Sequence, residues 1–137
     1  MGNTKSIGIA YSDQDISGAD TLLANSQFGY TAAAQGAVTQ ATSKSTGVTL
    51  NKSAGQITMN NAALAGATAV SFTLTNSFIS SNDIIILNVG AGATAAAYTA
   101  YVSSLGAGSA VLTLRNMTAA TSLSEAVVLN FAVIHCA

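Results

Sequence analysis

Residues 36–64 read GAVTQATSKSTGVTLNKSAGQITMNNAAL and contain three short β-type runs, separated by Ser/Lys/Gly and Asn-Asn breaks. In each run two residues lie two positions apart, which is the spacing of side chains that share one face of a pleated strand. These pairs are Val38 and Gln40, Val48 and Leu50, and Ile57 and Met59. The stretch therefore predicts three strands of a sheet, and it indicates a packed β shell rather than a catalytic centre.

Two further strands are predicted directly after this stretch. Residues 69–76, AVSFTLTN, alternate apolar side chains with Ser and Thr, which is typical of a strand with one face in water. Residues 83–89, DIIILNV, form a continuous β-branched run after a Ser-Ser-Asn turn. Such a run predicts a strand that is covered on both faces, in a sandwich or by an assembly contact.

The C-terminal third of the chain predicts three more strands. Residues 98–105 and 109–116 flank Gly106-Ala107-Gly108, a three-residue loop of the kind that closes a hairpin. Residues 125–134, EAVVLNFAVI, carry apolar side chains on both faces apart from Asn130, so this strand is expected in the middle of a sheet. Eight strands in one short chain predict an all-β fold, an eight-stranded jelly-roll-like β-sandwich.

Residues 1–36 differ from the rest and are predicted to form an extended N-terminal arm, with residues 37–137 as the jelly-roll domain. The arm holds Asp13, Asp15 and Asp20, which are three of the five acidic residues of the chain. Residues 6–11, SIGIAY, could pair as an edge strand, and Phe28 with Tyr30 could anchor the arm through buried aromatic area. The alternative is that residues 1–36 are an irregular first strand and loop of the same domain.

Charge is the scarce property of this sequence. Charged residues make up 7% of the 137 residues and the net charge is −1, whereas an ordinary globular domain has about 25% charged residues. Because a net charge near zero promotes association, we expect much of the surface to be covered by a partner or by copies of the same chain. Four scattered basic residues could not neutralise a run of phosphates, so nucleic acid is not an expected partner.

The sequence predicts no membrane segment and no disulfide. Thr, Ser, Asn and Gly interrupt the two long uncharged spans, residues 53–82 and 84–114, so neither holds the roughly 20 mainly apolar residues of a membrane helix. The first residues, MGNTKS, do not resemble a signal peptide. Cys136 is the only cysteine, which leaves stability to packing and oligomerisation and slightly favours synthesis in the cytoplasm.

Three short motifs have chemical alternatives, and none predicts a catalytic, cofactor or metal site. Residues 90–95, GAGATA, spell a dinucleotide loop, but no βαβ unit or ribose-binding acid follows them. Residues 13–18, DQDISG, begin like a calcium loop, but Ala24 stands where the bidentate Glu belongs. His135 and Cys136 would point to opposite faces of a strand, so they cannot form a catalytic pair. The chain is therefore predicted not to be an enzyme.

Two phrases, residues 37–65 and residues 122–134 (SLSEAVVLNFAVI), resemble capsid cement, or decoration, proteins of tailed bacteriophages. This resemblance implies a jelly-roll subunit on the outer surface of an icosahedral head, made in the host cytoplasm, that bridges major capsid proteins. It also implies self-association as a dimer or trimer. Asp13, Asp15, Asp20, Phe28 and Tyr30 of the arm are the expected contacts with the capsid or a neighbouring subunit.

The alternative function, from another class, is a receptor- or glycan-binding head domain of a phage fibre. Sugar sites usually stack a ring on an aromatic side chain beside convergent polar groups. Only Tyr98 and Tyr101 lie close together in this sequence, and they are expected on opposite faces of one strand. This placement weakens the prediction of a sugar-binding platform.

Overall fold

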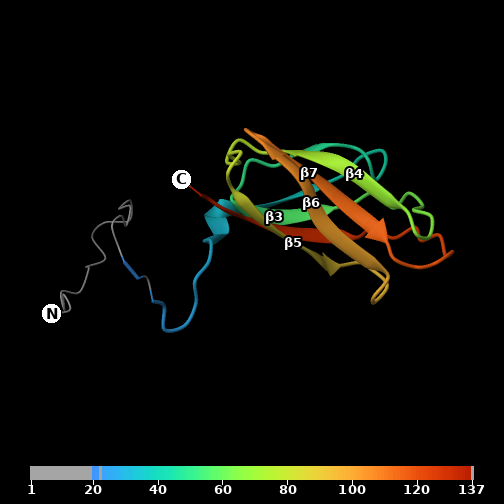
Figure 1. Cartoon of the computed structure of the whole chain (residues 1–137), viewed down its shortest axis with the longest axis horizontal. Coiled ribbons are helices and arrows are strands. Elements are labelled where there is room, and N and C mark those ends of the chain that lie inside the picture. The colour runs from blue at the N-terminus through green and yellow to red at the C-terminus, as the bar shows by residue number, and fades with distance from the viewer. Residues whose placement is uncertain (1–19, 22, 137) are drawn as a thin grey trace.

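The computed structural model describes residues 20, 21 and 23–136, and within them eight strands form two four-stranded sheets (Figure 1). The predicted all-β, eight-stranded sandwich is therefore confirmed. A single short 3₁₀ helix, η1 (Ala32–Ala34), precedes the first strand in the described part of the chain. The strands are β1 (Gln35–Thr39), β2 (Val48–Thr49), β3 (Ala54–Thr58), β4 (Ala69–Thr75), β5 (Ile84–Ala91), β6 (Tyr98–Gly106), β7 (Ser109–Asn116) and β8 (Val128–Ile134).

The three runs of residues 36–64 do not lie in one sheet, which corrects the expectation from sequence. β1 and β3 belong to the sheet with strand order β1-β3-β8-β5, whereas β2 belongs to the sheet with order β2-β4-β7-β6. The chain crosses the sandwich after β1, β2 and β3, so β1 pairs with β3 and β2 pairs with β4, both in parallel. Alternation predicts which side chains share a face, but it does not predict which strand lies beside another. The two parallel pairs also differ from the Greek keys of a jelly roll, in which the strands are antiparallel.

The C-terminal half follows the predicted connections closely. β8 lies between β3 and β5, which confirms the central position expected for residues 125–134, although the strand begins only at Val128. β6 and β7 form the predicted hairpin, but Gly106 pairs with Ser109, so the loop is Ala107-Gly108 and not three residues. Gly108 has φ +77°, a conformation that L side chains rarely adopt.

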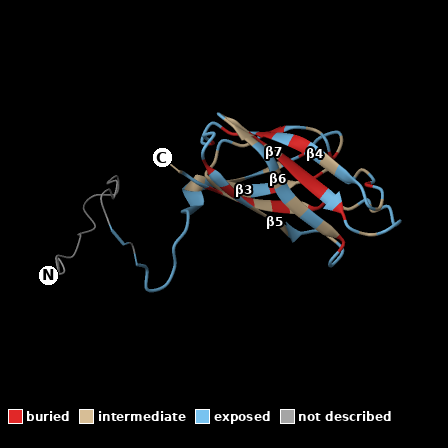
Figure 2. Ribbon diagram, viewed as in Figure 1, coloured by how far each residue is buried: buried red, intermediate tan, exposed pale blue. Residues whose placement is uncertain are grey.

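The core lies between the two sheets and is built from alternate residues of the strands (Figure 2). In β8, for example, Leu129, Phe131 and Val133 are buried while the residues between them are partly or fully exposed. Tyr98 of β6 packs against the core and Tyr101 is exposed, which confirms that they lie on opposite faces. The largest fully buried apolar side chains are Ile57, Met59, Leu74, Leu112, Leu114, Val127, Leu129 and Val133.

The described part of the arm leaves the sandwich next to η1 and extends away from it (Figure 1). Its residues before Ala34 are exposed (Figure 2). Because β1 begins at Gln35, the last two residues of the predicted arm, Gln35 and Gly36, belong to the sandwich. The strand expected at residues 6–11 lies outside the described residues.

Candidate interaction surface

The sheet with order β1-β3-β8-β5 has no charged residue in any of its four strands, and we call it the uncharged sheet. One face packs on the core and the other is turned outward. The cross-strand register places Gln56, Asn130 and Asn88 in one row of the outer face. The next row consists of Gln35, Ala54, Ala132 and Ile86. The outer face therefore combines uncharged amide side chains with an apolar end.

The apolar end of this face is formed by three isoleucines, Ile84, Ile86 and Ile134, which we call the isoleucine patch. Ile84 pairs with Ile134 across β5 and β8, and Ile86 follows on the same face. Their exposed fractions are 56%, 53% and 46%. Within one chain, residues 83–89 are not covered on both faces, because only Ile85 of the three isoleucines of β5 is buried. Cover of the second face by an assembly contact stays a prediction. The continuous apolar run thus leaves one face that the monomer does not cover.

The arm reaches the sandwich at the isoleucine patch. The Tyr30 hydroxyl donates a hydrogen bond to the carbonyl of Val133 in β8. A cavity of about 340 Å³ lies between arm and sheet, lined by Phe28, Gly29, Tyr30, Ile86, Ala132, Ile134 and His135. Phe28 is nevertheless 86% exposed, so its ring lines this cavity without being buried in it. The apolar side chains of the arm and the patch together form one incompletely covered surface.

The five residues predicted as capsid or subunit contacts lie in different places. Phe28 and Tyr30 lie together beside the uncharged sheet. Asp20 is exposed on the arm, and Asp13 and Asp15 lie outside the described residues. The three isoleucines of the patch are not among the predicted contacts, although the run DIIILNV contains the signal. In a two-sheet sandwich, a continuous apolar run exposes its outward face unless another layer covers it.

His135 and Cys136 are held by the buried carboxylate of Asp83 at the beginning of β5. Asp83 accepts hydrogen bonds from the Ser80 N–H at 2.7 Å, the His135 Nδ1 at 2.9 Å and the Cys136 N–H at 3.3 Å. The Ser80 bond is the main reason that the pKa of Asp83 is lowered, and the bonds from Cys136 and His135 add to it. These hydrogen bonds hold residues 135–136, which follow β8, against the turn before β5, and the Cys136 thiol takes no part in them.

A second polar cluster ties three loops together around Lys44. The buried Lys44 ammonium donates to the carbonyls of Asn60 at 2.5 Å and Glu125 at 2.6 Å, and burial lowers its pKa. The Glu125 carboxylate accepts from the Thr94 hydroxyl at 2.6 Å, which is the main cause of its lowered pKa. Burial, and then the neighbouring Glu125, raise the pKa of Tyr98 to about 12. The Lys44 ammonium and the Glu125 Oε1 are thus engaged in bonds between loops, whereas the buried Tyr98 hydroxyl and Glu125 Oε2 have no hydrogen-bond partner among the described residues.

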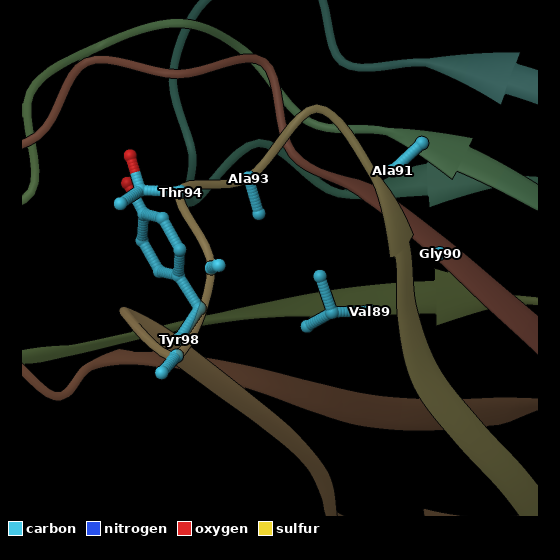
Figure 3. A pocket seen from close by; sticks show the side chains of 8 residues that line it. Val89, Gly90, Ala91, Ala93, Thr94 and Tyr98 are labelled. Carbon is cyan, nitrogen blue, oxygen red and sulfur yellow. The ribbon is translucent and has the colours of Figure 1, made fainter.

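The Gly/Ala-rich segment that spells a dinucleotide motif connects β5 to β6 without a helix (Figure 3). It borders an open pocket of about 280 Å³ lined by Val89, Gly90, Ala91, Ala93, Thr94, Ala95, Ala96 and Tyr98. The lining is mostly small and apolar, and Gly92 has φ +67° with the carbonyl of Ala126 at 2.4 Å from where a Cβ would stand. Gly92 is therefore required by the close approach of the Ala126 backbone. A dinucleotide site would need backbone N–H groups at the beginning of a helix, and this loop is followed by strand β6 instead of a helix.

Within the described ranges, His, Cys, Asp and Glu side chains form no group of three or more that could hold a metal ion. In the same part of the chain, no helix has the length and apolar character needed to cross a membrane. Comparison with family models, curated proteins and solved structures found no match for this chain.

Proposed function

We propose that this chain is a capsid cement protein, a structural and non-enzymatic component of a phage virion. It binds the outside of an icosahedral head and bridges neighbouring major capsid proteins. The observation that supports this proposal is the uncharged sheet, whose outer face exposes the isoleucine patch beside an extended arm. The cores of protein interfaces are depleted in charged residues in the same way. The resemblance of residues 37–65 and 122–134 to cement proteins selects the capsid as the partner.

Cementing requires no strong single bond. A standard interface buries about 1,600 Å² in total, and apolar area removed from water contributes about 25 cal/mol per Å². The three half-exposed isoleucines and Phe28 supply apolar area of this kind. Repeated over every site of a shell, such contacts add up and resist the pressure of the packaged genome. Aromatic side chains of an extended arm are suitable anchors, because they bury large area on ordering.

The test is co-sedimentation of the purified protein with mature heads that lack it, quantified as copies bound per head. We expect saturation at hundreds of copies, as a lattice of cement subunits requires. Absence of binding would overturn the proposal. Binding at a few dozen copies or fewer, or sedimentation with tail fractions instead, would favour the fibre-head alternative, which glycan arrays would then test.

The arm supplies a sharper version of this experiment. A chain that begins at Thr31 keeps η1, β1 and the bond from Lys52 to the Ala33 carbonyl, so its sandwich should fold. We expect this truncated chain to lose head binding. Phe28→Ser should weaken binding, whereas Phe78→Ser, which changes another exposed phenylalanine in the turn before β5, should not. Normal binding by the folded truncated chain would show that the arm is not the contact.

A further inference from the structure

We infer that β5 is the contact strand of a symmetric dimer, in which two copies of this chain join their uncharged sheets edge to edge. The occupant of the β5 edge is thus β5 of a second copy. The inference concerns contacts between copies and stands whether or not the chain binds a phage head.

Three of the four edge strands of the sandwich carry a feature that protects an edge from pairing. β2 has only two residues, and very short edges are poor templates. The Lys52 stem packs beside Gly36, and its ammonium, 2.8 Å from the Ala33 carbonyl, places a positive charge where β1 begins; charge near an edge discourages pairing. The register between β6 and β7 shifts between Val102 and Ser104, and such bulges interrupt pairing.

From Ile84 to Val89, β5 has none of these protections. It pairs regularly with β8 from Ile84 to Val89, with its register shift only after Val89, and its sequence IIILNVGA contains no charge and no proline. The nearest charge is Asp83, directly before the strand. Its carboxylate is turned inward and bound to Ser80, His135 and Cys136, so it cannot guard the edge. A long, regular and apolar edge of this kind is a template for another strand.

The register shows which backbone groups of β5 are free. The Val133 N–H donates to the Ser53 carbonyl, so Val133 directs its backbone groups to the β3 side of β8. Alternate residues of a strand direct their groups to opposite edges, so Ala132 and Ile134 face β5. Their partners Ile86 and Ile84 are therefore used inside the sheet. The residues whose N–H and C=O groups point to the open edge are Ile85, Leu87 and Val89. Of these groups, the Val89 carbonyl accepts a long bond of 3.4 Å from the exposed Asn88 side chain.

These three residues form a self-complementary set. In an antiparallel pair with a two-fold axis at Leu87, Leu87 faces its own copy and Ile85 faces Val89 of the second copy. All three residues then find partners, and the two uncharged sheets become one continuous sheet. Identical chains pair in this isologous way in most dimers. A regular, uncharged strand fits this edge best, and β5 of a second copy is such a strand. Because neither β5 strand carries a charged residue, no like charges are brought together.

The experiment measures the mass of the full-length protein by light scattering and its dissociation constant by sedimentation equilibrium. We expect a dimer, and we expect Ile86→Lys and Val89→Pro to raise the dissociation constant by roughly tenfold or more. Val89→Pro removes an N–H that points to the open edge, a position at which proline is tolerated. Gln56→Lys, which adds the same charge to the same outer face two strands away from the edge, should remain a dimer. Thermal melting checks that each variant is folded.

Cross-linking tests the register in a chain that carries Cys136→Ser. The two-fold axis at Leu87 places residue 86 opposite residue 88 of the other copy. A mixture of Ile86→Cys and Asn88→Cys chains should therefore form disulfide-linked dimers faster than either variant alone. The inference would be overturned by a monomeric wild type, a dimer unaffected by folded Ile86→Lys or Val89→Pro, equal disruption by Gln56→Lys, or no preferential cross-linking in the mixture. Dissociation on deletion of residues 1–30 would instead assign the dimer contact to the arm.

Discussion

At the scale of single residues, Lys44 is the clearest structural anchor, because its ammonium joins the loop before β2 to two other segments. Lys44→Met keeps the apolar stem but leaves the carbonyls of Asn60 and Glu125 without this donor. We expect a loss of about 1–3 kcal/mol in the free energy of unfolding, since unpaired buried acceptors carry that cost. Urea denaturation measures it. Lys52→Met is the matched control, because Lys52 makes one exposed bond to Ala33, and an equal effect of both variants would contradict the anchoring role.

The lowered pKa of Asp83 predicts how the stability of the folded chain depends on pH. Because its folded-state pKa is lowered, its contribution is present above its ordinary pKa, near 4, and is lost as the pH falls through the folded-state pKa. We expect the melting temperature to be steady from about pH 7 to 5 and to fall below about pH 4. Asp83→Asn should lower the melting temperature at neutral pH and flatten the acid dependence in part, since Glu125 also has a lowered pKa. An unchanged pH profile in this variant would contradict the assignment.

At the scale of elements, the connections depend on particular glycines to different degrees. Gly92 has a positive φ and no room for a Cβ, Gly108 has a positive φ in open space, and Gly106 has its nearest neighbour, the Ser109 Oγ, at 3.7 Å. We expect Gly92→Ala to cost most, about 1–3 kcal/mol, with Gly108→Ala intermediate and Gly106→Ala near zero. Denaturation of the three variants side by side tests this order. A Gly106→Ala variant that is the least stable would show that the turn geometry is different.

At the scale of the whole molecule, the distribution of charge determines how self-association responds to solution conditions. Ion pairs between exposed groups weaken as salt screens them, but the four strands of the uncharged sheet have no ions to screen. We expect the dimer dissociation constant to change little between low and moderate sodium chloride, and to decrease in sulfate, which strengthens apolar burial. Sedimentation equilibrium across the salt series is the measurement. Dissociation on addition of sodium chloride would indicate an electrostatic contact elsewhere.

The local sequence pattern was sufficient to predict several individual strands and one hairpin. Alternation in residues 69–76, the glycines after Leu105 and the two-sided apolar run of residues 125–134 correctly predicted β4, the β6–β7 hairpin and the central position of β8. These features depend on neighbours in the chain, on turn chemistry and on the period of two along a strand, so a sequence contains them directly. The aromatic pair Phe28 and Tyr30 of the candidate surface was identified from the same kind of local signal.

The pairing of strands that are distant in the sequence is visible only in the three-dimensional structure. Local sequence pattern predicts an all-β sandwich of eight strands with little charge. It did not determine that β1 and β3 pair in parallel across a connection through the other sheet, that Asp83 turns inward to His135, or that β5 is an edge. The isoleucines of β5 have the same local pattern in a central strand and at an edge. Whether they are buried depends on whether a second layer covers that face of the sheet, since Ile134 in the central strand β8 is also 46% exposed. Pairing over long separations is set by the packing of the whole core.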